Sequence, residues 1–435
     1  MLKLGNDVVL VPTYTPILTD ENSVSSNRLF YGGLNVYLQQ CLPVLARLPK
    51  WMDQFLNSPR LVNWVASRSM GTSAKQLGAL TVSMLQGHDG RQRKEVDRLV
   101  DWLSSEMRPD FIIFSNLLIG GAIPEIKRRI GCPTVVLLQG DDIFFEQLAA
   151  PYKEQALELL RSLAKQIDLF LVHSRDYGQR MQDKLGFDDL SWAMVPLAID
   201  PTDFAPVYGE SRADRAPTIG YLARLAPEKG LHILVDAFVD LHNRGTLPGA
   251  RLEIAGWLGK QHQPYWDDLQ KRLAKAGLSH LVNYRGSVDR AAKIDFLKSI
   301  DVICVPTVYQ EPKGLFVLEA LAAGVPYVQP NHGAFPEMNA ALGGGWLFQA
   351  NDHAALAAKL AETLLDLNLA RTIGGQGRMA VLGQATTNQA AQRLIELLEG
   401  LAKRDPRKCS VELDQAKYRS ASDYQKSRLV RGNLR

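Results

Sequence analysis

Two glutamates, Glu311 and Glu319, are spaced so that a loop and the start of a helix could present both carboxylates to one site. Pro312 and Gly314 mark a turn, and residues Leu315 to Ala323 are good helix formers. Glu311 is therefore expected in the loop, and Glu319 in the first turns of the helix, where side chains lean back towards the helix start. Because a carboxylate can accept hydrogen bonds from two vicinal hydroxyls, this spacing suits a sugar or a ribose.

The start of that helix could also bind an anion. The backbone amides of Gly314, Leu315 and Phe316 have no partner within the helix and lie at the positive end of its dipole. A diphosphate fits such a place, flanked by the hydroxyl-binding carboxylates. The alternative is a solvated helix start, because the dipole favours a first-turn carboxylate in any protein.

Two cations, Arg224 and Lys229, follow an apolar run, Thr218 to Leu222, that has the composition of a buried strand. Ligands of open α/β sheets bind at the carboxyl ends of strands, so both cations are expected at a ligand-binding edge. Arg224 through its planar fork and Lys229 as a point charge could neutralise a diphosphate leaving group. Taken alone, the two cations could equally form surface ion pairs.

Strand-like apolar runs alternate with helix-period segments along the chain, which predicts parallel sheets built from βαβ units in an α/β fold. The first series of expected strands comprises Asp7 to Val11, Phe111 to Phe114, Thr134 to Leu138, Leu169 to Val172 and Trp192 to Val195. The second comprises Thr218 to Leu222, Leu252 to Ala255, Val282 to Tyr284, Val302 to Val305 and Tyr327 to Gln329. Helical spacing predicts an amphipathic helix whose buried stripe is Leu231, Leu234, Val235, Phe238 and Leu241.

The chain has 435 residues, and a single core seldom exceeds about 250 to 300 residues, so two domains are expected. The segment 200–217 is rich in proline and charge without periodicity, and it predicts the linker. The first domain is then residues 1–205, with a helical or irregular insertion near 50–90, and the second is residues 206–385. Residues 386–435 are expected to form a helix that returns to the first domain, followed by a basic tail.

Positive charge is concentrated in that tail. The formal net charge is +4, but residues 401–435 hold ten Lys or Arg against four Asp or Glu, which leaves 40 against 42 elsewhere. A nearly neutral main body argues against nucleic acid as the principal partner. Charged tails are usually solvated, and the alternative here is weak peripheral contact with an anionic membrane surface.

The cysteine spacing and the short apolar runs argue against metal-binding, secreted and membrane-spanning proteins. The four cysteines lie far apart without C-x-x-C spacing, so neither a zinc site nor a disulfide framework is indicated, and no metal or other cofactor is expected. The first ten residues lack the pattern of a secretory signal, and no apolar run reaches the roughly 20 residues that cross a bilayer. A cytoplasmic protein is expected.

Taken together, these residues resemble the retaining glycosyltransferases of family 4, or glycosyltransferase group 1. The resemblance rests on A-R-L-A-P-E-K-G-L at 223–231 and on E-P-K-G-L-F-V-L-E at 311–319, which has the family's spacing of Glu, seven residues, Glu. It covers roughly residues 7–400, because further matches follow in the expected order. These matches are Tyr31 to Tyr37 with its Gly32-Gly33 loop, Arg108 to Asp110, Cys132 to Val136, Gly140 to Asp142, His173 with Ser174, and His332 with Gly333 and Glu337.

The resemblance implies the GT-B fold, in which two Rossmann-like doubly wound domains face each other across a cleft. It also implies a reaction that moves a sugar from a nucleotide-diphosphate sugar to an acceptor hydroxyl. The implied catalytic residues are Glu311, which would hold the donor sugar, and Arg224 and Lys229, which would hold the diphosphate. The implied donor-binding residues are Glu319 at the ribose, Gly314, Leu315, Phe316, His332, and Gly33 in a loop that would close over the site.

Two departures from the family pattern affect the expected chemistry. Gln139 stands before Gly140-Asp141-Asp142 where the family commonly has His, and Pro312 to Leu315 replace the usual Gly-Phe-Gly-Leu. Glutamine can hydrogen-bond a hydroxyl but cannot exchange a proton. Gln139, Asp141 and Asp142 are therefore predicted on the acceptor side. A donor-binding scaffold without turnover and a sugar-nucleotide epimerase are the alternative functions.

Overall fold

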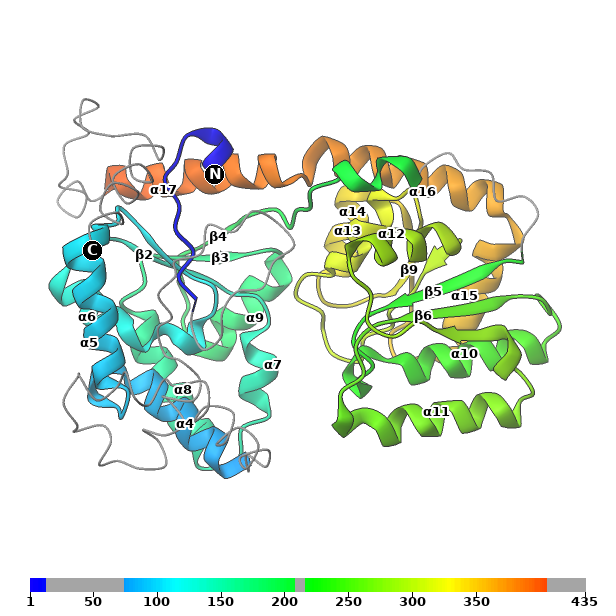
Figure 1. Ribbon diagram of the computed structural model, residues 1–435, viewed down its shortest axis with the longest axis horizontal. Coiled ribbons are helices and arrows are strands. Elements are labelled where there is room, and N and C mark those ends of the chain that lie inside the picture. The colour runs from blue at the N-terminus through cyan, green and yellow to red at the C-terminus, as the bar shows by residue number, and fades with distance from the viewer. Residues whose placement is uncertain (13–73, 208–215, 405–435) are drawn as a thin grey trace, which may run out of the picture.

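The computed structural model describes residues 1–12, 74–207 and 216–404, and these form two lobes (Figure 1). Within these ranges, the N-terminal lobe contains a four-stranded sheet and the C-terminal lobe a six-stranded sheet. All recorded strand pairs are parallel, and helices make the crossovers that parallel pairing requires. The parallel α/β architecture predicted from the alternating pattern is confirmed.

The sheet of the N-terminal lobe has the order β1-β2-β3-β4. Its strands are β1 (Ile112–Phe114), β2 (Thr134–Leu137), β3 (Leu169–Val172) and β4 (Trp192–Met194). The described helices of this lobe are α4 (Ala74–Gln86), α5 (Arg93–Trp102), α6 (Ile123–Arg129), α7 (Asp141–Glu146), α8 (Tyr152–Ala164) and α9 (Arg175–Leu185), with the 3-10 segment η6 (Leu117–Ala122) before α6. The part of the expected 50–90 insertion that is described is mainly α4, and residues 50–73 lie outside the described residues.

The sheet of the C-terminal lobe has the order β10-β9-β8-β5-β6-β7. Its strands are β5 (Thr218–Leu222), β6 (Arg251–Ala255), β7 (Val282–Tyr284), β8 (Val302–Ile303), β9 (Tyr327–Pro330) and β10 (Gly345–Phe348). Its helices are α10 (Leu231–Asn243), α11 (Gln263–Lys275), α12 (Arg290–Ser299), α13 (Leu315–Ala322), α14 (Phe335–Leu342), α15 (His353–Leu365) and α16 (Leu367–Gln384). This is the doubly wound order, and its direction reverses between β5 and β8, where open α/β sheets bind ligands.

Helix α10 shows why this lobe folds as the sequence predicts. The five side chains of its predicted stripe are at most 1% exposed, and burial of such side chains contributes about 1.5 to 3 kcal/mol each. Gly230 precedes the helix with φ 73°, and a Cβ there would lie 1.7 Å from the Pro306 carbonyl oxygen. The chain can therefore approach the loop after β8 this closely only with glycine at position 230.

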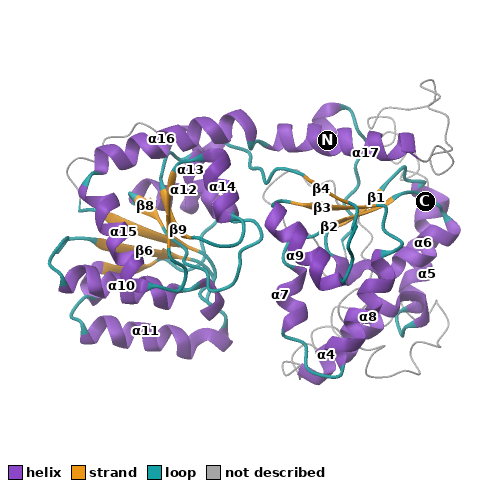
Figure 2. Ribbon diagram, turned by 180° about the vertical axis from the view of Figure 1, so that it is seen from behind, coloured by secondary structure: helices purple, strands orange, loops and turns teal. Residues whose placement is uncertain are grey.

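Helix α17 (Thr387–Arg404) continues from α16 and runs along the N-terminal lobe (Figures 1 and 2). Its Leu398 is buried in a cluster with Val135, Leu169 and Leu171 of the N-terminal sheet. Ile199, after β4, forms a parallel bridge with Thr386, just before α17. Apolar packing of α17 and this bridge thus tie the C-terminal end of the described chain to the N-terminal lobe.

The predicted strands agree closely with the structure except at two places. Strands β3, β5 and β7 have the predicted bounds, and the other predicted strands from β1 to β9 differ by one or two residues. The strand expected at Asp7 to Val11 is wrong: Leu10 is a single bridge residue, and Val9 and Leu10 are 38% and 43% exposed, without the cover that a buried strand needs. Strand β10 was not predicted, because its apolar run is only three residues long after Gly345.

No helix in the described ranges combines the length and the apolar composition needed to cross a membrane.

Candidate functional site

The reversal point of the C-terminal sheet brings together three polar side chains. Lys229 lies in the loop after β5, and Tyr309 and Glu311 lie in the loop after β8. The Lys229 ammonium is 2.7 Å from the Glu311 carboxylate, which also accepts a 2.6 Å hydrogen bond from the Tyr309 hydroxyl. Lys229 also donates to the Tyr309 hydroxyl and lies 4.9 Å from the centre of its ring. These contacts use two of the three ammonium N–H groups, and among the described residues the third is left for a ligand oxygen.

Burial sets the electrostatics of this cluster. The side chain of Glu311 is 7% exposed and that of Lys229 is 15% exposed. Burial by itself would raise the pKa of Glu311, but the Lys229 ammonium, the Tyr309 hydroxyl and the Gly314 amide together lower it below its usual range. Burial, reinforced by the Glu311 charge, raises the pKa of Tyr309. Glu311 is therefore an anion and Tyr309 a neutral donor at physiological pH.

The backbone around Glu311 is fixed by the loop after β9. The Ala334 amide donates to the Glu311 carbonyl oxygen at 2.8 Å. Gly333 has φ 60°, and a Cβ there would lie 2.6 Å from the backbone nitrogen and oxygen of Glu311. His332, in the same loop, bonds the Thr307 carbonyl oxygen through Nε2 at 2.9 Å, and burial lowers its pKa. His332 thus lies beside the cluster, joined to the loop after β8 by that bond.

Helix α13 begins where the sequence predicts, and it carries Glu319 towards a partner that was not predicted. Gly314 is its N-cap with φ 72°, and Leu315 to Ala322 form the helix, so the amides of Gly314, Leu315 and Phe316 lie at its start. The Glu319 carboxylate accepts a 2.7 Å hydrogen bond from the Lys293 ammonium of α12. Its side chain is 13% exposed, compared with 28% for Lys293. No motif marked Lys293, because its pairing depends on how α12 packs.

Arg224 differs from Lys229 in its surroundings. Its side chain is 53% exposed, and its guanidinium lies 3.3 Å from Glu228, four residues along the chain. The buried Tyr221 hydroxyl donates to the Arg224 carbonyl oxygen at 3.1 Å, which fixes the backbone of this loop. Arg224 therefore shares the loop of Lys229, but its own side chain remains accessible to a ligand.

The carboxyl edge of the C-terminal sheet faces the N-terminal lobe, and within the described residues four hydrogen-bonded contacts cross between them. Lys313 donates to the Gln139 side-chain oxygen at 2.8 Å, and Arg180 donates to the Gln310 carbonyl oxygen at 3.2 Å. The Ser174 hydroxyl donates to the Pro312 carbonyl oxygen at 3.3 Å. The predicted acceptor-side Gln139 and the loop containing Glu311 therefore lie at the same interdomain contact.

The fourth contact joins Glu337 of α14 to the first turn of α9. Its carboxylate accepts the backbone amides of Arg175 at 2.9 Å and Asp176 at 2.7 Å. These amides have no partner within α9, so a carboxylate from the other lobe caps the helix and complements its dipole. The sequence placed Glu337 only as a family match, and it gave no sign of this capping role.

Asp141 and Asp142 follow β2, and both carboxylates are hydrogen-bonded within the N-terminal lobe. Asp141 is 3% exposed and accepts the amides of Leu117 at 2.6 Å and Gln139 at 2.9 Å. Asp142 accepts from the Tyr177 hydroxyl at 2.8 Å and lies 3.3 Å from the Arg180 guanidinium. Their predicted contact with an acceptor stays a prediction, and their observed contacts position the loop that contains Gln139.

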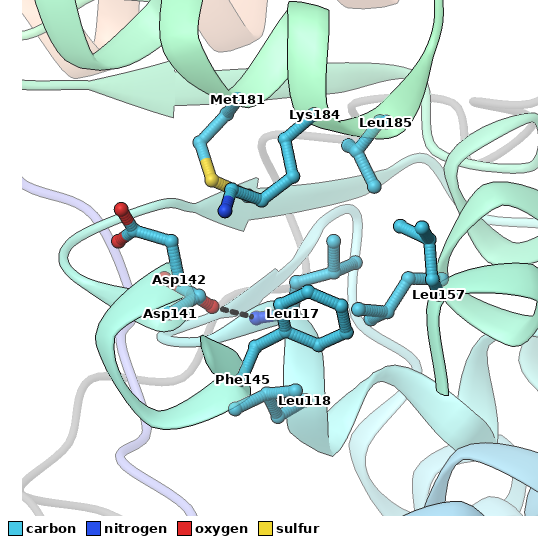
Figure 3. Close-up of a pocket in the computed structure, with 10 residues that line it drawn as sticks. Leu117, Leu118, Asp141, Asp142, Phe145, Leu157, Met181, Lys184 and Leu185 are labelled. Carbon is cyan, nitrogen blue, oxygen red and sulfur yellow. Dashed lines mark hydrogen bonds between the residues drawn. The ribbon is translucent and has the colours of Figure 1, made fainter. Parts of the chain in front are cut away.

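A small cavity beside Asp141 is distinct from this interdomain site (Figure 3). Its volume of about 10 Å³ holds about one water molecule, far less than a nucleotide sugar needs. The side chains around it come from η6, α7, α8 and α9, and most are apolar. They are Leu117, Leu118, Asp141, Asp142, Phe145, Leu157, Leu160, Met181, Lys184 and Leu185.

Among the residues that the structure describes, one group of side chains has the spacing of metal ligands. The ligand atoms of His88, Asp97 and Glu125 lie within 4.8 Å of one another in the N-terminal lobe. Arginines already pair with both carboxylates: Arg129 contacts Asp97 and Glu125, and Arg128 contacts Glu125. The positive charge of these arginines opposes a cation at this place. The expectation that the chain needs no metal stays a prediction.

The Gly33 loop, residues 31–37, lies outside the described residues.

Known proteins resemble this chain both in sequence and in structure. Residues 209–380 match the family Glycosyl transferases group 1. Sucrose-phosphate synthase from Thermosynechococcus elongatus superposes with a TM-score of 0.60 at 19% identity, covering 72% of this chain and 79% of that one. Anabaena HepE in complex with UDP and glucose gives the same TM-score and identity over 71% of this chain and 82% of that one. The chain has the GT-B fold. The predicted fold class is thus confirmed.

Curated relatives of this GT-B chain are glycosyltransferases. A GDP-mannose-dependent phosphatidylinositol monomannoside mannosyltransferase of Mycobacterium tuberculosis is 30% identical over 207 residues, which are 46% of this chain and 52% of that protein. A D-inositol 3-phosphate glycosyltransferase of Corynebacterium jeikeium is 25% identical over 409 residues, covering 85% of this chain and 92% of that protein. With the first of these and several others, the match spans only about half of the relative's length.

Proposed function

We propose that this GT-B chain is a retaining glycosyltransferase that moves a sugar from a nucleotide-diphosphate sugar to an acceptor hydroxyl. The observation that carries the proposal is the placement of Lys229 and Glu311, on the loops after β5 and β8, at the reversal point of the C-terminal sheet. A doubly wound sheet binds its ligand at that point. The matched family region, residues 209–380, and the glycosyltransferase relatives support the same conclusion.

The proposed roles follow from the surroundings of each residue. The diphosphate would bind the amides of Leu315 and Phe316 at the start of α13, together with Arg224 and the third N–H of Lys229. The Gly314 amide, also expected to bind it, already donates to the Glu311 carboxylate. In the reaction, negative charge grows on the departing diphosphate, so fixed cations there stabilise the transition state more than the bound donor.

The carboxylates would bind hydroxyls. Glu311 would contact the donor sugar and Glu319 the ribose, while His332 would lie on the donor side and the Gly33 loop would close over it. Gln139 would contact the acceptor, in a loop held by Asp141 and Asp142. We further propose that the reaction takes place in the cytoplasm without a metal ion, and that the basic segment 401–435 contacts anionic membranes weakly.

A thermal-shift panel of nucleoside diphosphates and their sugar derivatives tests this function. The expected result is a rise in melting temperature with the diphosphates of one base, and release of that diphosphate from the corresponding nucleotide sugar. Tight binding without any release would instead support a donor-binding scaffold. Absence of binding by every nucleotide in the panel would overturn the proposal.

A further inference from the structure

Lys313 occupies a distinctive place in the interdomain contact. It lies two residues after Glu311 and directly before Gly314, the N-cap of α13. Its ammonium crosses to the N-terminal lobe and donates to Gln139 Oε1 at 2.8 Å. Gln139 Nε2 donates to the Ser115 carbonyl oxygen at 2.8 Å, so the amide is held with its oxygen towards Lys313. This amide therefore orients the ammonium without neutralising it.

In the described part of the chain, the charges around Lys313 leave that ammonium without a counter-ion. Within the described residues Lys313 forms no ion pair. Glu311 is already paired with Lys229, and Asp141 is bound by backbone amides. Burial lowers the pKa of Lys313, the charges of Glu311 and Asp141 oppose that effect, and the Lys229 charge adds to it. A partly buried cation with one neutral acceptor lacks the partner that burial of a charge normally requires.

We propose that Lys313, oriented by Gln139, binds an anionic group of the substrate at the point where donor sugar and acceptor meet. The inference rests on the proposed function, which puts the donor sugar at Glu311 and the acceptor at Gln139. The anion could belong to the donor, as the carboxylate of a uronic acid, or to the acceptor, as a phosphate or carboxylate. Either group would complete the hydrogen bonds of the ammonium in a poorly solvated place, where charge-assisted bonds are strong.

A comparison of nucleotide sugars tests whether the anion that Lys313 binds belongs to the donor. Calorimetry with the full chain would compare a nucleoside diphosphate, its neutral hexose derivative and its uronic acid derivative, for the base that binds. If the donor has the anion, the uronic acid derivative should bind about 10-fold more tightly than the neutral one. Lys313→Gln should remove that preference, and Lys313→Arg should keep most of it. The affinity for the nucleoside diphosphate should change less than about 2-fold in both variants.

Diphosphate release from the neutral donor tests whether the anion that Lys313 binds belongs to the acceptor. If the acceptor has the anion, sugar phosphates should accelerate release by the wild type more than the corresponding neutral sugars, and Lys313→Gln should lose that difference. Lys275→Gln is the matched control, because it removes an exposed lysine at the end of α11 and should change neither assay. Gln139→Glu should act like Lys313→Gln, since a carboxylate there would pair with the ammonium and exclude a second anion.

The outcomes separate this inference from the proposed function. The inference alone is overturned if the wild type binds a nucleotide but has the same affinity for the charged and neutral donors and the same diphosphate release with charged and neutral acceptors. A charge preference that survives in Lys313→Gln also overturns the inference and leaves the proposed function intact. Failure of every nucleotide to bind the wild type overturns the proposed function and this inference with it.

Discussion

The Lys229 ammonium and the Glu311 carboxylate lie 2.7 Å apart, although 82 positions separate them in the chain. Both side chains are largely buried, so removal of one partner leaves the other charge without compensation. Lys229→Met should therefore lower the free energy of unfolding of the C-terminal lobe by about 3 kcal/mol.

Urea denaturation measures this loss, and two further variants interpret it. Lys229→Met combined with Glu311→Gln should be less destabilised than the sum of the single changes, because the pair interacts directly. Arg224→Ala is the matched control, since its 53% exposed side chain forms a surface pair worth at most about 1 kcal/mol. Equal loss of stability in Lys229→Met and Arg224→Ala would contradict the account of a buried pair.

Asp141 should give the folded chain a measurable pH dependence. Burial raises the pKa of Asp141 to about 6, above the value of about 3.9 for an exposed aspartate. Between these values the folded state binds more protons than the unfolded state, so this group's contribution to stability falls as pH rises, by about 3 kcal/mol in all. Asp141→Asn cannot titrate, and its stability should lack that fall. A difference between wild type and variant that stays constant from pH 4 to pH 7 would show that Asp141 keeps its ordinary pKa.

Glu319→Ala should weaken binding of a nucleoside diphosphate by about 1.5 to 3 kcal/mol, the cost of a lost charged hydrogen bond to the ribose. The fold should survive, because the Lys293 left behind is 28% exposed and can be solvated. Calorimetry with the diphosphate and with its 2′,3′-dideoxy analogue identifies the contact. Wild type should prefer the normal ribose, and Glu319→Ala should not. If Lys293→Ala weakens binding as much as Glu319→Ala, the ion pair, and not the Glu319 carboxylate itself, supports the site.

Glu337→Ala should loosen the contact between the lobes. The variant loses the carboxylate that caps α9 from α14, and two charge-assisted hydrogen bonds of this kind are worth about 1.5 to 3 kcal/mol each. Small-angle X-ray scattering should show a larger radius of gyration, with an unchanged circular dichroism spectrum. Glu396→Ala, on the exposed surface of α17, is the control and should scatter like the wild type. An unchanged radius for Glu337→Ala would mean that the other contacts alone hold the lobes together.

The sequence predicted the elements whose signal is local. The apolar runs at β3, β5 and β7 and the stripe of α10 are continuous in the chain, so their burial follows from composition and spacing. The expected strand at Asp7 to Val11 is wrong because an apolar run becomes a strand only with a paired neighbour and a covered face. The sequence cannot show whether either is present.

The candidate site was also predictable only where its signal is local in the chain. Residues on one loop, such as Glu311 and Gly314, were placed by the turn and the helix start that follow them. Their partners could not be placed, because Tyr309, Lys293 and Glu337 find their contacts only when loops and helices from different parts of the chain pack together. Asp141 was predicted on the acceptor side, which stays a prediction, and its hydrogen bonds to two backbone amides depend on packing that the sequence does not show.

Proton NMR of donor turnover shows whether the chain is a retaining transferase. The experiment follows the wild type and Arg224→Ala with the nucleotide sugar whose diphosphate stabilises the protein. We expect the wild type to release the diphosphate and to form a product with the anomeric configuration of the donor. Arg224→Ala should lower kcat more than it raises KM, because its charge acts mainly on the departing diphosphate. A product with inverted configuration would contradict the retaining mechanism, and an unconsumed donor that binds tightly would contradict the assignment of the chain as a transferase.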